Sequence, residues 1–156
     1  MELRKILKYY KGKRVLITGH TGFKGSWLAY ILDSIGAEIT GYSLEPNTEP
    51  SLFKSLSFSE KFNSIIGDIR DKEKFKETVQ SFNPEFIFHL AAQPLVLESY
   101  NNPTETFDVN FSGTLNLLEI LRELLDLSVQ VVFVTTDKVY ENLEIGAPFV
   151  ETDKLG

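Results

Sequence analysis

Three glycines at a regular spacing carry the clearest chemistry in the sequence. Gly19, Gly22 and Gly25 follow the apolar run Val15–Ile17 and precede the amphipathic run Ser26–Ile35. A strand, a glycine turn and a helix in this order bring backbone amides close to a pyrophosphate, and the helix N-terminus favours an anion. We therefore predict a dinucleotide-binding turn made by Gly19, Thr21, Gly22, Phe23, Lys24 and Gly25.

A hydroxyl, a carboxyl and an amine stand together at Thr136, Asp137 and Lys138. They follow the β-branched run Val129–Val134, which is typical of a strand covered on both faces, so they are expected at a strand end. A lysine acts as a base only where burial or a neighbouring positive charge lowers its pKa. The alternative is an exposed ion pair of Asp137 and Lys138 in a turn, which contributes little to stability.

The elements that must position these residues alternate between strand and helix along the chain. Strands are predicted at Arg14–Thr18, Glu38–Ser43, Asn63–Ile66, Phe86–Leu90 and Val129–Val134. Helices are predicted at Lys24–Ile35, at Asp71–Phe82 and from Pro103 to about Leu125, after a short amphipathic helix with Leu3, Ile6, Leu7 and Tyr10. This alternation indicates an α/β fold, a doubly wound parallel sheet of the Rossmann type with strand order 3-2-1-4-5. We expect residues 1–156 to form one NAD(P)-binding domain.

The carboxyl ends of the predicted strands meet at one crevice, where such sheets bind their ligands. This rule brings together four segments that are far apart in sequence: Gly19–Gly25, Asp68, Ala91–Gln93 and Thr135–Lys138. In the glycine turn, His20 is expected to be exposed toward the cofactor, whereas His89 is expected to be a core histidine. Two histidines without an acidic cluster predict no metal site.

The overall composition is that of an ordinary globular protein of 156 residues with a formal net charge of −6. Such an acidic chain is not expected to bind nucleic acid or anionic membranes in general. The sequence contains no cysteine, which excludes disulfides and thiolate metal sites. It contains neither an apolar stretch of membrane-spanning length nor the apolar core of a secretory signal, so we expect a soluble cytoplasmic protein.

Four motifs in a fixed order carry a resemblance to a known family. They are T-G-x-x-G-x-x-G at Thr18–Gly25, G-D-I-R-D at Gly67–Asp71, H-L-A-A-Q at His89–Gln93 and N-x-x-G-T at Asn110–Thr114. The chain resembles the N-terminal part of the extended short-chain dehydrogenase/reductase family of nucleotide-sugar enzymes. Within this family, residues 19–28 are most similar to the corresponding residues of the CDP-glucose 4,6-dehydratases.

The resemblance implies a cofactor, a reaction and a substrate class. Members of this group hold NAD tightly, remove hydride from C4 of the sugar of CDP-glucose, eliminate water across C5 and C6, and return the hydride to C6. The product is a 4-keto-6-deoxy sugar nucleotide, an intermediate for deoxysugars of surface polysaccharides such as lipopolysaccharide. The implied small-molecule partner is therefore a nucleotide sugar.

The resemblance also assigns cofactor contacts to individual residues. Asp68 would accept a hydrogen bond from the adenine amino group, although a turn aspartate is the alternative, and Ile69 would pack on the adenine ring. Asn110 is expected to bond backbone and so to hold the end of the fourth strand in place. Further cofactor contacts are expected from Leu90, Ala91, Ala92, Gln93 and Thr135.

Catalytic roles follow from the same resemblance. Thr136 would bond the C4 hydroxyl, and Asp137 would protonate the departing C6 hydroxyl. Lys138 stands where many nucleotide-sugar dehydratases carry glutamate, and it would act as base or proton relay.

The choice between NAD and NADP stays open in the sequence. A carboxylate about twenty residues past the glycines binds the ribose hydroxyls in NAD-binding sheets, but this chain has Ser43 there, with Glu45 two residues beyond. The resemblance favours NAD, and Glu45 would repel a 2′-phosphate. The alternative is NADP with Lys24 as the phosphate partner. Leu97 stands where the group usually carries a basic residue.

Family members also use a Y-x-x-x-K pair, which does not occur after Lys138. We therefore expect an N-terminal portion, truncated before the last strands and the substrate domain, that is inactive by itself. An apolar sheet edge and uncovered helix faces would lead it to self-associate as a homo-oligomer. Two alternatives remain: a non-catalytic nucleotide-binding or self-associating half-domain, and a fragment of another nucleotide-sugar epimerase or reductase.

Overall fold

The computed structural model describes the chain apart from residues 1, 124–127, 137, 143, 145 and 147, so the candidate acid Asp137 lies outside the described residues. Five strands form one parallel sheet in the order β3-β2-β1-β4-β5. The strands are β1 (Arg14–Thr18), β2 (Glu38–Ser43), β3 (Phe62–Ile66), β4 (Phe86–His89) and β5 (Gln130–Phe133). Parallel pairing in this order confirms the predicted doubly wound α/β architecture.

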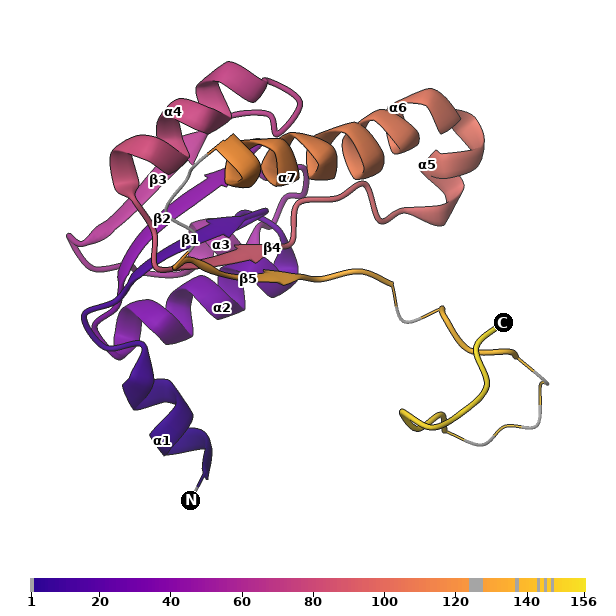
Figure 1. Ribbon diagram of the computed structural model, residues 1–156, viewed down its shortest axis with the longest axis horizontal. Helices are drawn as coiled ribbons and strands as arrows, with labels where there is room; N and C mark the ends of the chain where they lie inside the picture. The colour runs from indigo at the N-terminus through magenta and orange to yellow at the C-terminus, as the bar shows by residue number, and fades with distance from the viewer. Residues whose placement is uncertain (1, 124–127, 137, 143, 145, 147) are drawn as a thin grey trace.

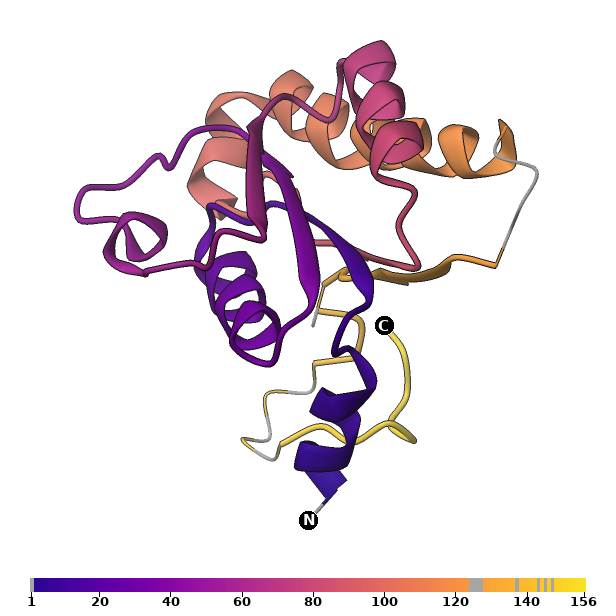
Figure 2. The same cartoon turned by 90° about the vertical axis from the view of Figure 1, so that its left-hand side faces the viewer.

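Helices cover both faces of the sheet (Figure 1). One face carries α2 (Phe23–Ser34), and the other carries α4 (Lys72–Phe82) and α7 (Gly113–Glu123), as the turned view in Figure 2 also shows. Side chains along β1 alternate between these layers: Leu16 belongs to the core cluster under α4 and α7, whereas Ile17 belongs to the cluster under α2. Because both faces are buried, the apolar residues of β1 follow one another without alternation.

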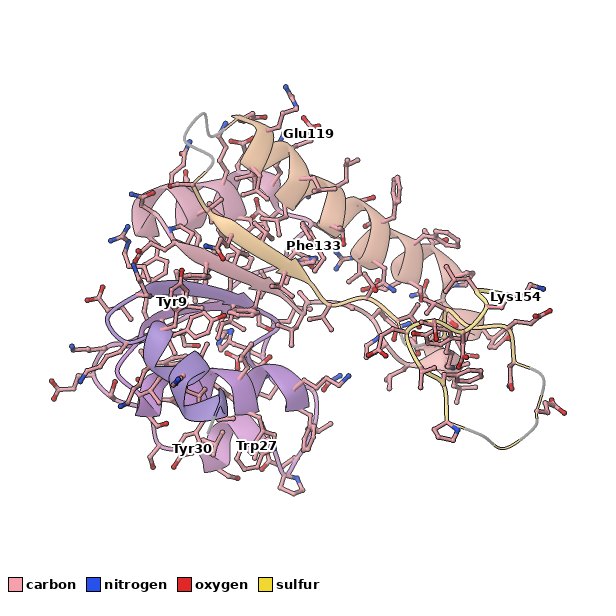
Figure 3. All side chains as sticks on the ribbon, turned by 60° about the horizontal axis from the view of Figure 1, so that its bottom comes forward. Tyr9, Trp27, Tyr30, Glu119, Phe133 and Lys154 are labelled. Atoms are coloured by element: carbon pink, nitrogen blue, oxygen red, sulfur yellow. The ribbon has the colours of Figure 1, made fainter. Side chains whose placement is uncertain are left out.

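The N-terminal helix α1 (Glu2–Tyr9) ends against the sheet. The ring of Tyr9 meets Phe86 of β4 edge-on with ring centroids 5.7 Å apart, and the ring of Tyr10 meets it at 5.0 Å. Figure 3 shows Tyr9 beside the strands. The end of α1 therefore packs on the body of the protein, as the apolar spacing of its sequence predicts.

The predicted long helix is a rod of three consecutive segments. These are α6 (Pro103–Phe107), the π-helix η1 (Asp108–Ser112) and α7, and the predicted end at Leu125 lies outside the described residues. A π-helical turn widens the backbone spiral without changing the apolar spacing enough for the sequence to reveal it. The rod is preceded by α5 (Val96–Asn101), which the sequence did not predict, and the short helix α3 (Leu52–Ser55) lies between β2 and β3.

After β5 the chain runs away from the sheet (Figure 1). Within this segment the ring of Tyr140 stacks on Phe149 with centroids 5.1 Å apart, and Lys154 pairs with Glu141 at 2.9 Å. No helix in the described part of the chain is long and apolar enough to cross a membrane.

Candidate functional site

The glycine turn between β1 and α2 is built by close backbone packing. Gly19 has a positive φ of 75°, and a Cβ there would lie 2.8 Å from the amide nitrogen of Ala91. A Cβ on Gly25 would overlap the carbonyl oxygen of Gly19, but a Cβ on Gly22 would meet only that oxygen, at 3.4 Å. The fold therefore requires glycine at positions 19 and 25. At Gly22 a side chain would instead fill the open space that a pyrophosphate needs.

The N-terminus of α2 adjoins this open space without a side-chain cap. Its N-cap is Gly22, which has no side chain to cap the helix, and among the described residues no side chain accepts a hydrogen bond from the first-turn amides. The side chains of Phe23 and Lys24 are exposed. Uncapped N–H groups at the start of a helix of 12 residues favour an anion, so the turn fits the pyrophosphate of a dinucleotide.

Thr18, the last residue of β1, forms hydrogen bonds with the residues at the end of β4. Its hydroxyl oxygen accepts from the amides of Leu90 and Ala91, both at 3.1 Å, and lies 2.8 Å from Nδ1 of His89. Because the two amides occupy both lone pairs of the Thr18 hydroxyl oxygen, this hydroxyl donates its proton to Nδ1 of His89. The other ring nitrogen, Nε2, then carries the proton of the neutral ring and donates to the hydroxyl of Thr114 at 3.2 Å. His89 is a neutral core histidine, as predicted, and burial lowers its pKa to about 4. Because the amides of Leu90 and Ala91 bond Thr18, these residues would contact a cofactor through other atoms, and this contact stays a prediction.

Asn110, in the π-helix η1, clamps the loop that follows β4. Its Oδ1 accepts from the amide of Gln93 at 2.8 Å, and its Nδ2 donates to the carbonyl of the same residue at 3.1 Å. The Gln93 side chain accepts from the amide of Leu95 at 2.6 Å and donates to the hydroxyl of Thr106 at 2.8 Å. Asn110 thus bonds backbone, as predicted. The cofactor contacts expected from Gln93 and from the half-buried or exposed residues beside it, Ala92 among them, stay predictions.

Asp68, just past β3, is held by Arg70. Nε of Arg70 lies 3.0 Å from both carboxylate oxygens, Nη2 lies 2.6 Å from Oδ2, and the Arg70 amide donates to Oδ1 at 2.9 Å. The hydrogen bonds from the guanidinium lower the pKa of Asp68. Arg70 was not predicted as a partner of Asp68, although a partner two residues after an aspartate is typical of an aspartate turn. The Asp68 side chain remains 28% exposed, so its contact with an adenine amino group stays a prediction.

Ile69 belongs to the core beneath α7. Its side chain is 4% exposed, and a Cβ on Gly113 would overlap it. Nδ2 of Asn116 donates to the Ile69 carbonyl at 3.0 Å, which fixes the backbone here. This burial leaves little of the side chain for an adenine ring, and the expected packing stays a prediction.

His20 is fully buried, so the expectation that it is exposed toward a cofactor is wrong. Its Nε2 lies 2.7 Å from the hydroxyl of Ser64, and its ring meets Phe53 edge-on with centroids 5.0 Å apart. Burial lowers the pKa of His20 to about 4, so the ring is neutral at pH 7. The neighbouring Thr21 turns to the end of β2, where its hydroxyl bonds that of Ser43. These two side chains therefore anchor the turn to the neighbouring strands.

The candidate catalytic segment follows β5. Thr135, Thr136 and Lys138 are exposed, and the hydroxyl of Thr136 accepts from the amide of Lys138 at 3.1 Å. In the described part of the chain, no hydrogen bond or ion pair joins them to the glycine turn, and no group of histidine and acidic side chains is placed to hold a metal ion. Lys138 is therefore not in the buried setting that a lysine base requires, and the proposed roles of this segment stay predictions.

The chain is similar to several known nucleotide-sugar enzymes. Residues 16–156 match the family described as GDP-mannose 4,6 dehydratase. The chain is similar to CDP-glucose 4,6-dehydratase of Salmonella typhimurium, with 45% identity over 148 residues, or 95% of this chain and 41% of the relative. It is also similar to CDP-paratose 2-epimerase of Salmonella typhi, with 35% identity over 132 residues, or 84% of this chain and 39% of the relative.

The same fold occurs in a solved structure with a bound dinucleotide. UDP-glucose 4-epimerase of Thermus thermophilus, in complex with NAD, superimposes with a TM-score of 0.75 and 31% sequence identity. The match covers 92% of this chain and 44% of the epimerase. The chain thus spans less than half the length of each of these three relatives.

Proposed function

Because the chain belongs to the GDP-mannose 4,6-dehydratase family of extended short-chain dehydrogenases/reductases, we propose that it is the dinucleotide-binding part of an NAD-dependent CDP-glucose 4,6-dehydratase. The observation that carries the proposal is the open space at Gly22 beside the uncapped N-terminus of α2. The similarity to two enzymes that are named for CDP-sugars supports CDP as the nucleotide of the substrate. Cofactor binding is proposed for the 156 residues, and turnover for a protein of the relatives' length. A cytoplasmic location is part of the proposal.

Different residues of the chain would bind different parts of the cofactor. The first-turn amides of α2 would bind the pyrophosphate, and Asp68, oriented by Arg70, would accept from the adenine amino group. Thr18 and Asn110 would keep the ends of β1 and β4 at a constant separation. When bound, NAD supplies a hydride acceptor that later returns the hydride. Thr136, Asp137 and Lys138 would hydrogen-bond the sugar and move its protons.

The binding step is tested by titrating the chain with NAD in a calorimeter. Gly22→Val places a side chain in the open space, so the dissociation constant for NAD is expected to rise at least tenfold, a loss of about 1.4 kcal/mol. The melting temperature is expected to stay near that of the wild type, because Gly22 has a negative φ and its Cβ has room. Gln80→Ala, on the exposed side of α4, is the control. Unchanged NAD affinity in Gly22→Val would contradict the proposed site.

The chemical step is tested in a protein of the relatives' length that contains these residues. CDP-glucose is expected to give the 4-keto-6-deoxy product, while UDP-glucose and GDP-mannose are expected to react far more slowly. Lys138→Met is expected to abolish turnover and to leave NAD binding unchanged. Normal turnover by this variant would remove Lys138 from the mechanism, and epimerisation without loss of water would favour the epimerase alternative.

A second candidate function is a nucleotide-binding module without turnover. It is favoured by the exposed positions of Thr136 and Lys138, which the described residues do not join to the glycine turn. NAD binding combined with no conversion of any nucleotide sugar would support it. A homo-oligomeric state is also part of the proposal.

A further inference from the structure

The basic residues of the chain are concentrated at its N-terminal end. Residues 1–14 contain six lysines and arginines and one acidic residue, whereas residues 15–156 contain ten lysines and arginines and 21 acidic residues. The formal net charge of −6 therefore combines a basic N-terminal segment with an acidic body. Surface charges more than about 8 Å apart are largely screened at physiological ionic strength, so a partner that meets this segment is little affected by the body.

Helix α1 presents this positive charge to solvent, and it projects from the sheet (Figure 1). Lys5 and Lys8 are exposed and lie three residues apart, which places them on the same side of the helix, and the exposed Lys11 follows in the next turn. In the part of the chain that the structure describes, no carboxylate pairs with these three lysines. By contrast, Nζ of Lys13 lies 2.7 Å from Oε1 of Glu85. The three lysines are therefore available to a negatively charged partner.

Aromatic side chains accompany these lysines. Tyr9, at the end of α1, is 56% exposed, and Trp27 and Tyr30 of α2 are 44% and 37% exposed. Figure 3 shows all three on the side of the molecule that carries α1 and α2. The turn after α1 is bonded to the turn after α2, because the amide of Gly12 donates to the carbonyl of Gly36 at 2.8 Å. The two helices therefore form one surface that combines positive charge with tyrosine and tryptophan.

We propose that this surface binds the headgroup region of an anionic lipid bilayer. Lysines attract anionic headgroups, and the rings of tryptophan and tyrosine are favoured at the level of the headgroups. The exposed rings of Trp27 and Tyr30 favour a bilayer over nucleic acid, because a duplex offers no interfacial layer for them. Each lysine near such a bilayer raises the partition coefficient about fivefold, so three lysines give measurable and reversible binding. The proposal does not depend on dinucleotide binding.

Co-sedimentation of the full chain with lipid vesicles tests the proposal. The chain is expected to bind vesicles of equimolar phosphatidylcholine and phosphatidylglycerol, to be released by high salt, and not to bind vesicles of phosphatidylcholine alone. Replacement of all three lysines of the surface by glutamine is expected to lower the partition coefficient about a hundredfold, and Lys8→Gln alone about fivefold. Lys154→Gln, which removes another exposed lysine at the opposite end of the molecule (Figure 3), is the control and is expected to bind as the wild type does.

The fluorescence of Trp27 identifies the surface that meets the bilayer, because Trp27 is the only tryptophan in the chain. Its emission is expected to shift to shorter wavelength when the mixed vesicles are added, and to be quenched by brominated lipid in those vesicles. Binding that leaves the emission of Trp27 unchanged would place the contact on another surface and would overturn the proposal.

The remaining outcomes also decide the matter. A folded wild-type chain that does not bind the mixed vesicles, or an equal loss of binding in Lys8→Gln and Lys154→Gln, would overturn the proposal. Tighter binding to duplex DNA than to the vesicles would assign the lysines to nucleic acid and overturn it as well. Melting curves check that each variant is folded. A chain that binds vesicles but not NAD would overturn the proposed function and leave this surface standing.

Discussion

The two histidines beside the candidate site have structural roles. His89 accepts from Thr18 and donates to Thr114, and His20 bonds Ser64 beneath the glycine turn. Both rings are buried, and burial lowers the pKa of each from about 6.5 to about 4. Because burial favours the uncharged form, both histidines serve as neutral hydrogen-bonding groups rather than as acids, bases or ligands.

This burial predicts a loss of stability in mild acid. Between pH 6.5 and 4 the two histidines bind protons in the unfolded chain but not in the folded one. The free energy of unfolding is therefore largest above pH 6.5 and falls as the pH drops toward 4. The expected loss from pH 7.5 to pH 5 is on the order of 2 kcal/mol for each histidine.

Urea denaturation at pH 7.5 and at pH 5 measures this loss. Both pH values lie above the range near 4 where ordinary carboxyl groups titrate, so carboxyl groups contribute little to the difference. His89→Gln is expected to reduce the pH dependence by about half, because one of the two histidines is removed. Equal stability at both pH values would show that the histidines are not buried in the neutral form.

At the scale of elements, the rod of α6, η1 and α7 places a side chain that a regular helix would direct elsewhere. The π-helical turn carries Asn110, whose two amide atoms bond the backbone of Gln93. Such π-helical turns are frequent at functional sites. The rod therefore acts as a brace for the loop after β4, which lies next to the glycine turn through the contact of Gly19 with Ala91.

Removal of this brace is expected to loosen the loop without unfolding the sheet. Asn110→Leu has a similar size but loses both bonds to Gln93, so the free energy of unfolding is expected to fall by about 2 kcal/mol. Amide hydrogen exchange is expected to rise at residues 93–101 and to change little in β1 and β2. Asn101→Leu, at an exposed position in α5, is the control. Unchanged exchange at Gln93 would contradict the role of Asn110.

At the scale of the whole molecule, the outer side of the same rod carries exposed apolar side chains. Phe107 is 74% exposed and Phe111 is 66% exposed, and Leu115 and Leu118 continue the row along α7. Contiguous exposed apolar residues of this kind mark interaction surfaces. We therefore place the predicted self-association on the rod, with a second copy of the chain as the partner.

Sedimentation velocity tests this placement. The wild-type chain is expected to sediment as a dimer or larger species at tens of micromolar, and Phe111→Glu is expected to give a monomer, because a buried charge in the interface is costly. Tyr30→Glu is the control, since Tyr30 and Trp27 lie on α2, away from Glu119 of α7 (Figure 3). A monomeric wild type, or the same loss of association in Tyr30→Glu, would contradict the prediction.

The order of strands and helices, the strand order of the sheet and the place of the glycine turn follow from the sequence alone. These features depend on local patterns: apolar runs, glycine spacing and turn residues act within a few positions of one another. The right-handed crossover rule then leaves few ways to arrange the strands, so the sheet order follows from the element order.

Which side chains from separate strands and helices meet depends on the tertiary packing. The burial of His20, the ion pair of Arg70 with Glu105 of α6, and the hydroxyl pair of Thr21 and Ser43 arise from these meetings. Periodicity sets the face on which a side chain lies but not its partner on another strand or helix. Hydrogen bonds need an approach within about 3 Å, and only the packed backbone sets distances that precisely.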